Sequence, residues 1–147
     1  MKSPHNPVNV KGYTTPQPFA GFQIPITLQS LAIRRYCEDR GMVFNHHASE
    51  NIGSASYHVL QKLVDEALSY RAIAMCSITM LPKHRSRRTE LLRRAVTRGV
   101  SFHFVFEQVT VVSHDDVGQL NDLSSLCNLI PSGDRQVVYL RTMIELQ

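Results

Sequence analysis

The feature that most constrains the fold is an almost unbroken apolar run, RAIAMCSI, at residues 71–78. Helical patterns precede and follow this run along the chain. Such unbroken apolar runs are typical of strands that are covered on both faces, whereas strands with one solvent-exposed face alternate between apolar and polar residues. We therefore expect residues 71–78 to form a central strand of a parallel sheet.

Extended and helical patterns alternate along the rest of the chain. The expected strands lie at 8–14, 42–47, 71–78 and 100–107, and the expected helices lie at 26–40, 57–70, 83–98 and 115–127. Right-handed crossovers between parallel strands place helices on both faces of a sheet. The pattern thus predicts an α/β fold with three layers, α/β/α, and a mainly parallel sheet.

The length of 147 residues and a hydrophobic fraction of 43% predict a single globular domain over residues 1–147. Within it, residues 1–8 read as a flexible arm and residues 14–25 as a long loop rich in proline. Long loops inside compact domains are often functional. The C-terminal tail at 131–147 is compatible with either a strand or a helix.

Several classes of protein are disfavoured by simple absences in the sequence. Cys37, Cys76 and Cys127 are far apart and form no CxxC pair, which favours reduced thiols. His46 and His47 lack a third ligand at helical spacing, and no glycine-rich phosphate loop is present, so no metal or cofactor is expected. No stretch is long and apolar enough for a membrane span or a signal peptide, so we expect a cytoplasmic protein.

The charge is concentrated in one block. Residues 83–98, KHRSRRTELLRRAVTR, hold seven Lys or Arg against one acid, Glu90, in a chain with a formal charge of +4. Such a block can attract nucleic acid, a phosphorylated metabolite or an acidic partner. It can also be an ordinary solvated helix face.

Ligands of parallel α/β sheets bind outside the carboxyl ends of the strands. Applied to the expected strands, this rule selects the loop after Tyr13 and a set of polar residues, namely Ser49, Glu50, Ser77, Lys83, Arg85 and Glu107. Glu50 is a candidate general acid or base, or else a helix cap or ion-pair partner. His103 and Glu107 lie four apart in an expected strand and would share a face, which makes both candidates for proton transfer.

Two polar side chains fall on the apolar arcs of their helices. Gln29 lies at the centre of the arc of the helix at 26–40, so its amide must bond to a ligand or to the preceding loop. Arg88 lies on the arc of the basic helix. A buried guanidinium there needs a carboxylate, a phosphate or several carbonyls around it. We weigh a ligand anion against an internal pair with Glu50 or Glu107.

The order of segments resembles the catalytic domain of serine recombinases (resolvases and invertases) over roughly residues 12–107. The resemblance lies in GY, IRRYCEDRGM, ASENIGSAS, LQKLVDEALSYRAIAMCSITML and LLRRAVTRGVSFHFVFE. Either alignment of the family's Arg-Val-Ser motif puts Pro25 or Gln17 where the nucleophilic serine would stand. Met80 and Lys83 replace the family's two arginines. The resemblance therefore implies a resolvase-like fold without DNA strand exchange.

A closer resemblance is to the sporadic carbohydrate cluster proteins, which are encoded among genes for surface polysaccharides or unusual sugars. The matching positions are Gly12-Tyr13, Pro18-Phe19, Gly21, Ile24-Pro25, Gln29, Ile33-Arg34, Tyr36-Cys37, Ser49-Glu50, Leu81-Pro82, Arg88, His103-Phe104 and Glu107. This resemblance implies a role in making or modifying a sugar-containing metabolite. It also adds Arg34 to the candidates.

Together these observations favour a small enzyme with cofactor-independent proton-transfer chemistry, namely isomerisation, elimination or cyclisation of a sugar-derived or phosphorylated small molecule. The catalytic candidates are Glu50, His103 and Glu107, and the substrate-binding candidates are Gln29, Arg34, Ser49, Ser77 and Arg88. The alternative is a catalytically inactive recombinase fold that binds a partner protein or nucleic acid. For the enzyme itself, we do not expect nucleic acid as a partner. Leu28 and Leu31 lie off the main apolar stripe, which is compatible with a homo-oligomer.

Overall fold

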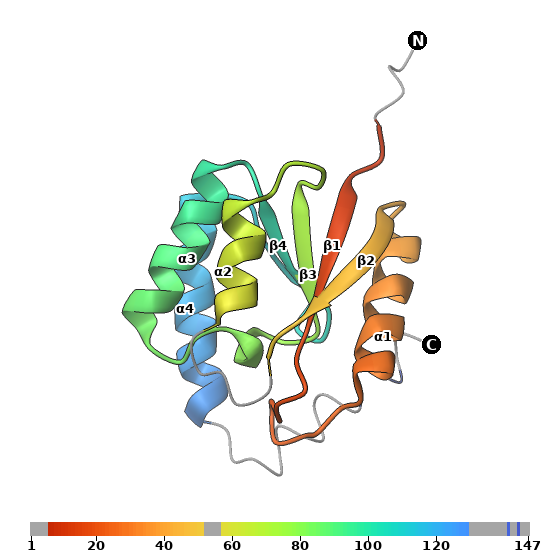
Figure 1. Ribbon diagram of the computed structural model, residues 1–147. Coiled ribbons are helices and arrows are strands. Elements are labelled where there is room, and N and C mark those ends of the chain that lie inside the picture. The colour runs from red at the N-terminus through yellow and green to blue at the C-terminus, as the bar shows by residue number, and fades with distance from the viewer. Residues whose placement is uncertain (1–5, 52–56, 130–140, 142–143, 145–147) are drawn as a thin grey trace.

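The computed structural model describes residues 6–51, 57–129, 141 and 144 (Figure 1). The strands are β1 (Asn9–Thr14), β2 (Val43–Ser49), β3 (Ala72–Met75), β4 (Ser101–Phe104) and β5 (Val109–Val111). The helices are α1 (Ile26–Asp39), α2 (His58–Asp65), α3 (Arg85–Thr97) and α4 (His114–Leu129), and a short 3-10 helix spans Ile78–Met80. Most of the expected arm and tail falls outside the described residues.

The strands form one sheet in the order β2-β1-β3-β4-β5. The first four strands pair in parallel, and β5 pairs antiparallel with β4. α1 packs against β1, β2 and β3, whereas α3 packs against β4, α2 and α4. Figure 1 shows α1 on one side of the sheet and the other three helices on the opposite side. The predicted three-layer α/β/α fold with a mainly parallel sheet is confirmed.

β3 is the centre of the core, as its apolar run predicts. It lies between β1 and β4, and none of its four residues is exposed. The strand is shorter than the expected 71–78 because the chain turns into the 3-10 helix after Met75. Ser77 starts that helix, and its hydroxyl accepts a hydrogen bond from the Thr79 amide.

The carboxyl ends of α1 and α2 are defined by local contacts. α1 ends at Asp39, and the predicted glycine, Gly41, follows with a φ of 66° and an amide that donates to the Glu38 carbonyl at 3.2 Å. α2 ends at Asp65, five residues before the expected end at residue 70. The Tyr70 hydroxyl donates to the carbonyl of Leu63 at 2.6 Å, which satisfies a carbonyl in the last turn of the helix. In the described part of the chain, no helix has both the length and the apolar character that crossing a membrane requires.

The predicted carboxyl end of the strand at 100–107 is wrong. β4 stops at Phe104, and a turn follows in which Gln108 has a φ of 55°. This turn reverses the chain into β5, a three-residue strand that the sequence analysis does not predict. Glu107 therefore lies in a turn instead of on the same strand face as His103.

Candidate functional site

The carboxyl ends of β1, β2 and β3 and the turn after β4 meet at one edge of the sheet. The Glu50 amide donates to the Thr14 carbonyl at 2.9 Å, which holds the end of β2 against the end of β1. The Phe106 amide donates to the Cys76 carbonyl at 2.8 Å, which holds the turn after β4 against the end of β3. This edge carries four of the predicted site residues, namely Ser49, Glu50, Ser77 and Glu107.

Glu50 is the most deeply engaged of these residues. Its side chain is 5% exposed and its carboxylate accepts a hydrogen bond from the Tyr13 hydroxyl at 2.9 Å. It also accepts from the amides of Val59 and Leu60, at 3.2 and 3.4 Å, in the first turn of α2. α2 has no side-chain cap of its own, so Glu50 fills that role from another element.

The phenol of Tyr13 is a fixed hydrogen-bond donor toward Glu50. Burial, and then the charge and hydrogen bond of Glu50, raise the pKa of Tyr13 well above its usual range. Tyr13 thus keeps its proton at every physiological pH. Tyr13 is not among the residues predicted from the sequence, although its place at the end of an expected strand was a usable signal.

A second acid–hydroxyl pair lies at the end of β3. The Ser77 hydroxyl, which is fully buried, donates to Glu107 Oε1 at 2.7 Å, and the Ile78 amide donates to Glu107 Oε2 at 3.2 Å. Burial and then Glu107 raise the pKa of the Cys76 thiol to about 12, so this cysteine is an inert neutral thiol. Glu107 ties the turn after β4 to the end of β3.

Gln29 is buried on the sheet side of α1, as predicted. Its Oε1 accepts from the Thr15 amide at 3.1 Å, and its Nε2 donates to the carbonyls of Thr15 and Ile24 at 2.7 and 2.8 Å. These bonds fasten the long loop to the helix, which is one of the two roles that the sequence left open. Contact between Gln29 and a substrate stays a prediction.

Arg88 is 5% exposed in the first turn of α3. Its Nε donates to Asn121 Oδ1 at 2.8 Å, and its Nη1 donates to the carbonyls of Pro82 and Lys83 at 3.2 and 3.3 Å. Burial, and then the nearby charge of Arg85, lower its pKa.

The alternative that pairs Arg88 with an internal carboxylate is wrong. Among the described residues, no acid lies within ion-pair distance of Arg88. Backbone carbonyls and the side-chain amide of Asn121 satisfy its Nε and Nη1, whereas its Nη2 makes no hydrogen bond to a described residue. Asn121 lies in α4, and the sequence analysis missed it.

His103 lies away from this edge, in the middle of β4. Its Nδ1 is 3.1 Å from the Tyr36 hydroxyl of α1, and its Nε2 is 3.0 Å from the Ser101 hydroxyl. Burial and then the charge of Arg40 lower its pKa to about 4. The expectation that His103 and Glu107 share a strand face is wrong, because the turn after Phe104 separates them.

The two remaining candidates differ in their surroundings. Ser49 is half-buried, and its hydroxyl oxygen is buried without a hydrogen bond to any described residue. Arg34 is exposed on α1, as its place off the apolar stripe predicts, and its guanidinium carbon lies 6.0 Å from the centre of the Phe44 ring. Among the described residues, no three His, Cys, Asp or Glu side chains are grouped to hold a metal ion.

Comparison with known proteins identifies the class of fold. The chain is similar to the N-terminal catalytic domain of TP901-1 integrase, with 16% identity, a TM-score of 0.58, and coverage of 82% of this chain and 95% of that domain. It is also similar to a resolvase family site-specific recombinase from Streptococcus pneumoniae, with 10% identity, a TM-score of 0.60, and coverage of 94% and 95%.

The fold is thus that of resolvase catalytic domains, as the sequence resemblance implied. At these identities the likeness shows the fold alone. No protein-family model and no curated protein sequence matches the chain.

Proposed function

We propose that the protein is a small enzyme that binds a phosphorylated, sugar-derived metabolite at the carboxyl edge of the sheet and catalyses a proton transfer without a cofactor. The observation that supports this most directly is the two acid–hydroxyl contacts at that edge, the buried one of Tyr13 with Glu50 and the part-buried one of Ser77 with Glu107. The sequence resemblance to the sporadic carbohydrate cluster proteins supports the substrate class.

In this proposal Arg88 binds the anionic group of the substrate. Its Nε and Nη1 are held by the protein, which orients the guanidinium, and Nη2 is left for a phosphate oxygen. Glu50 takes the proton, and its bond from the protonated Tyr13 holds the carboxylate in place. His103 lies too far along β4 to share this site, so we leave it out of the mechanism.

The test is a thermal-shift screen of the protein against sugar phosphates and nucleotide sugars. We expect one of these compounds to raise the melting temperature of the wild-type protein. The rise should be lost in Arg88→Lys, which keeps the charge but loses the fork of donors, and it should persist in Glu50→Gln while turnover of the compound disappears. Arg87→Lys, on the exposed face of the same helix, is the matched control.

Two results would contradict the proposal. One is a ligand whose stabilising effect is unchanged in Arg88→Lys. The other is turnover that survives Glu50→Gln in a variant whose unfolding is otherwise unchanged.

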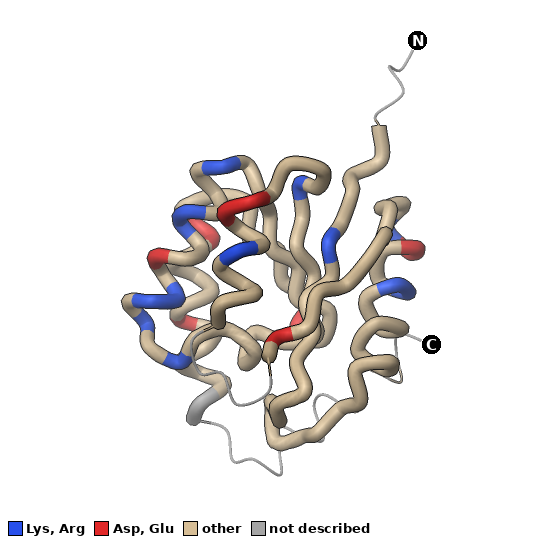
Figure 2. The backbone as a smooth tube through the Cα atoms, in the orientation of Figure 1, with Lys and Arg blue, Asp and Glu red and all other residues tan. Residues whose placement is uncertain are grey.

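A second candidate function is the binding of an acidic partner protein, and the surface of α3 favours it. Lys83, Arg85, Arg87 and Arg93 are exposed there, and Figure 2 shows Lys and Arg spread along this helix. A shallow, open surface region lies over this helix. Its lining residues are Arg85, Ser86, Thr89, Glu90 and Arg93.

Fluorescence anisotropy with an acidic peptide and with short duplex DNA tests this second function. Binding of the peptide that Arg85→Ala or Arg93→Ala weakens, while Arg88→Lys does not, would favour the interaction module over the enzyme. Binding of DNA alone, with a steep dependence on salt, would identify a nucleic-acid surface instead.

A further inference from the structure

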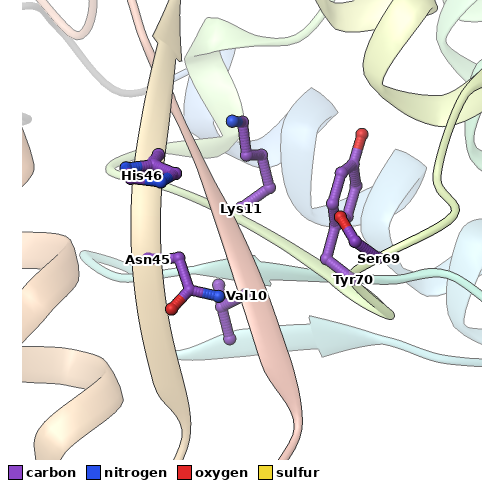
Figure 3. Close-up of a pocket in the computed structure, with 6 residues that line it drawn as sticks. All are labelled: Val10, Lys11, Asn45, His46, Ser69 and Tyr70. Carbon is purple, nitrogen blue, oxygen red and sulfur yellow. The ribbon is translucent and has the colours of Figure 1, made fainter.

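A separate hollow of about 230 Å³ lies on the α2 face of the sheet, toward the amino-terminal half of the strands (Figure 3). It is lined by Val10, Lys11, Asn45, His46, Ser69 and Tyr70. The hollow exists because α2 ends at Asp65, so no residue of that helix lines it. It is distinct from the candidate site, whose residues follow the carboxyl ends of the same strands.

Lys11 is an unusual residue for its position. β1 has a strand on each side, and the residues of such a strand are normally apolar on both faces. The neighbours of Lys11, Val10 and Gly12, are buried, whereas Lys11 is half-buried and reaches into the hollow. A lysine in this place needs a reason other than packing.

A β-bulge brings further polar groups to the same place. Val10 pairs with Phe44 and Lys11 pairs with His46, so Asn45 is an extra residue in β2. Because Lys11 and His46 are register partners on parallel strands, their side chains project from the same face. Figure 3 shows His46 and Lys11 side by side, with Ser69 and Tyr70 on the other side of the hollow.

The charge in the hollow is uncompensated. Lys11 makes no hydrogen bond or ion pair with any described residue, and no acid is among the lining residues. One acid, Glu66, affects a lining residue through its charge. Burial, and to a smaller extent the charge of Glu66, raise the pKa of the Tyr70 phenol. That phenol is itself occupied as a donor to Leu63. An ammonium, an imidazole, an amide and a hydroxyl therefore face the hollow as available donors.

We propose that this hollow is a binding site for the phosphate group of a small phosphate monoester, with Lys11 as its principal contact. Several donors of different reach fit the three terminal oxygens of a phosphate monoester better than the two oxygens of a carboxylate. The volume lies below the 300–1,000 Å³ of common organic-ligand pockets, which suits a phosphate with a short carbon fragment. The inference does not depend on the proposed function.

The experiment is a titration of the ¹⁵N-labelled full chain with inorganic phosphate, glycerol 3-phosphate, glycerol and acetate, followed by amide chemical shifts. We expect saturable shifts at Lys11, His46 and Ser69 with the two phosphates and none with glycerol. Lys11→Met should weaken phosphate affinity at least about tenfold, because it removes a charge-assisted hydrogen bond. Tighter binding of glycerol 3-phosphate than of phosphate would identify the monoester as the ligand.

Lys62→Met is the matched control, since it removes one exposed lysine from α2 outside the lining. His46→Gln provides a second variant at an exposed position, where folding is less at risk, and it should also weaken binding. The proposal is overturned if millimolar phosphate causes no saturable shift at these residues. It is also overturned if Lys11→Met and Lys62→Met reduce binding equally, or if acetate binds as tightly as phosphate.

Discussion

Gln29 joins the long loop to the core through both polar atoms of its side chain. Substitution by leucine keeps the volume but leaves the Thr15 amide and the carbonyls of Thr15 and Ile24 without their partner. We expect Gln29→Leu to lower the free energy of unfolding by roughly 2–4 kcal/mol, because buried groups that lose their hydrogen bonds carry the full desolvation cost.

Urea unfolding followed by circular dichroism measures this loss. Gln23→Leu is the control, because Gln23 is an exposed glutamine of the same loop with a single hydrogen bond, to the Pro16 carbonyl. Equal losses in the two variants would show that Gln29 does not fasten the loop.

His103 makes stability depend on pH in a defined window. Its pKa falls from 6.5 to about 4 on folding, because burial and then Arg40 disfavour the imidazolium. The unfolded chain therefore binds more protons between these two values, and the free energy of unfolding rises with pH across this window. Full stabilisation is present above 6.5 and is lost as the pH falls toward 4. The partly exposed ring limits the effect to about 2 kcal/mol.

The measurement is denaturant unfolding of the wild type and of His103→Gln at several pH values in that window. We expect the difference between the two proteins to shrink as the pH falls. His114→Gln, at an exposed position at the start of α4, should follow the wild-type curve. A constant difference between wild type and His103→Gln would contradict the assignment.

At the scale of elements, α2 depends on the carboxylate of Glu50, the residue that follows β2. Glu50→Ala removes the acceptor for the Val59 and Leu60 amides and for the Tyr13 hydroxyl. We expect a loss of roughly 2–4 kcal/mol and faster hydrogen exchange in the first turn of α2, since its amides have no other cap. Glu38→Ala, at an exposed position of α1, serves as the control. Unchanged exchange at Leu60 would rule out the capping role.

The elements also show where the sequence was and was not informative. The buried run of β3 and the glycine after α1 predicted their structures because each reflects a local requirement, burial on two faces or a positive φ. β5 has only three residues and forms by pairing with β4, which no local pattern reveals. The early end of α2 is accompanied by a hydrogen bond from the Tyr70 hydroxyl to the Leu63 carbonyl, a contact that periodicity does not reveal.

For the whole molecule, the expected topology predicted the order of the layers and placed the candidate site at the carboxyl ends of the strands. It did not predict which residues are in contact there. The helical arcs predicted that Gln29 and Arg88 are buried, but not that loop carbonyls and Asn121 would bind them. Partners from distant segments are a tertiary property.

Leu28 and Leu31 are about half exposed, at 50% and 52%, on the outer face of α1. The homo-oligomer that they suggested stays a prediction, which light scattering after size-exclusion chromatography can check.

The bulge in β2 has a consequence beyond the phosphate hollow. Among the described residues, β2 is an edge strand of the sheet, and a regular edge strand offers an unpaired ladder on which another chain can add and aggregate. The bulge at Asn45 interrupts the regular pairing of β2 with β1 between Phe44 and His46, and such bulges twist an edge strand away from further pairing. At the other edge, β5 is only three residues long. Each edge strand of the described sheet is thus a poor template for a further strand, and the irregularity that shapes the hollow also disfavours edge-to-edge association.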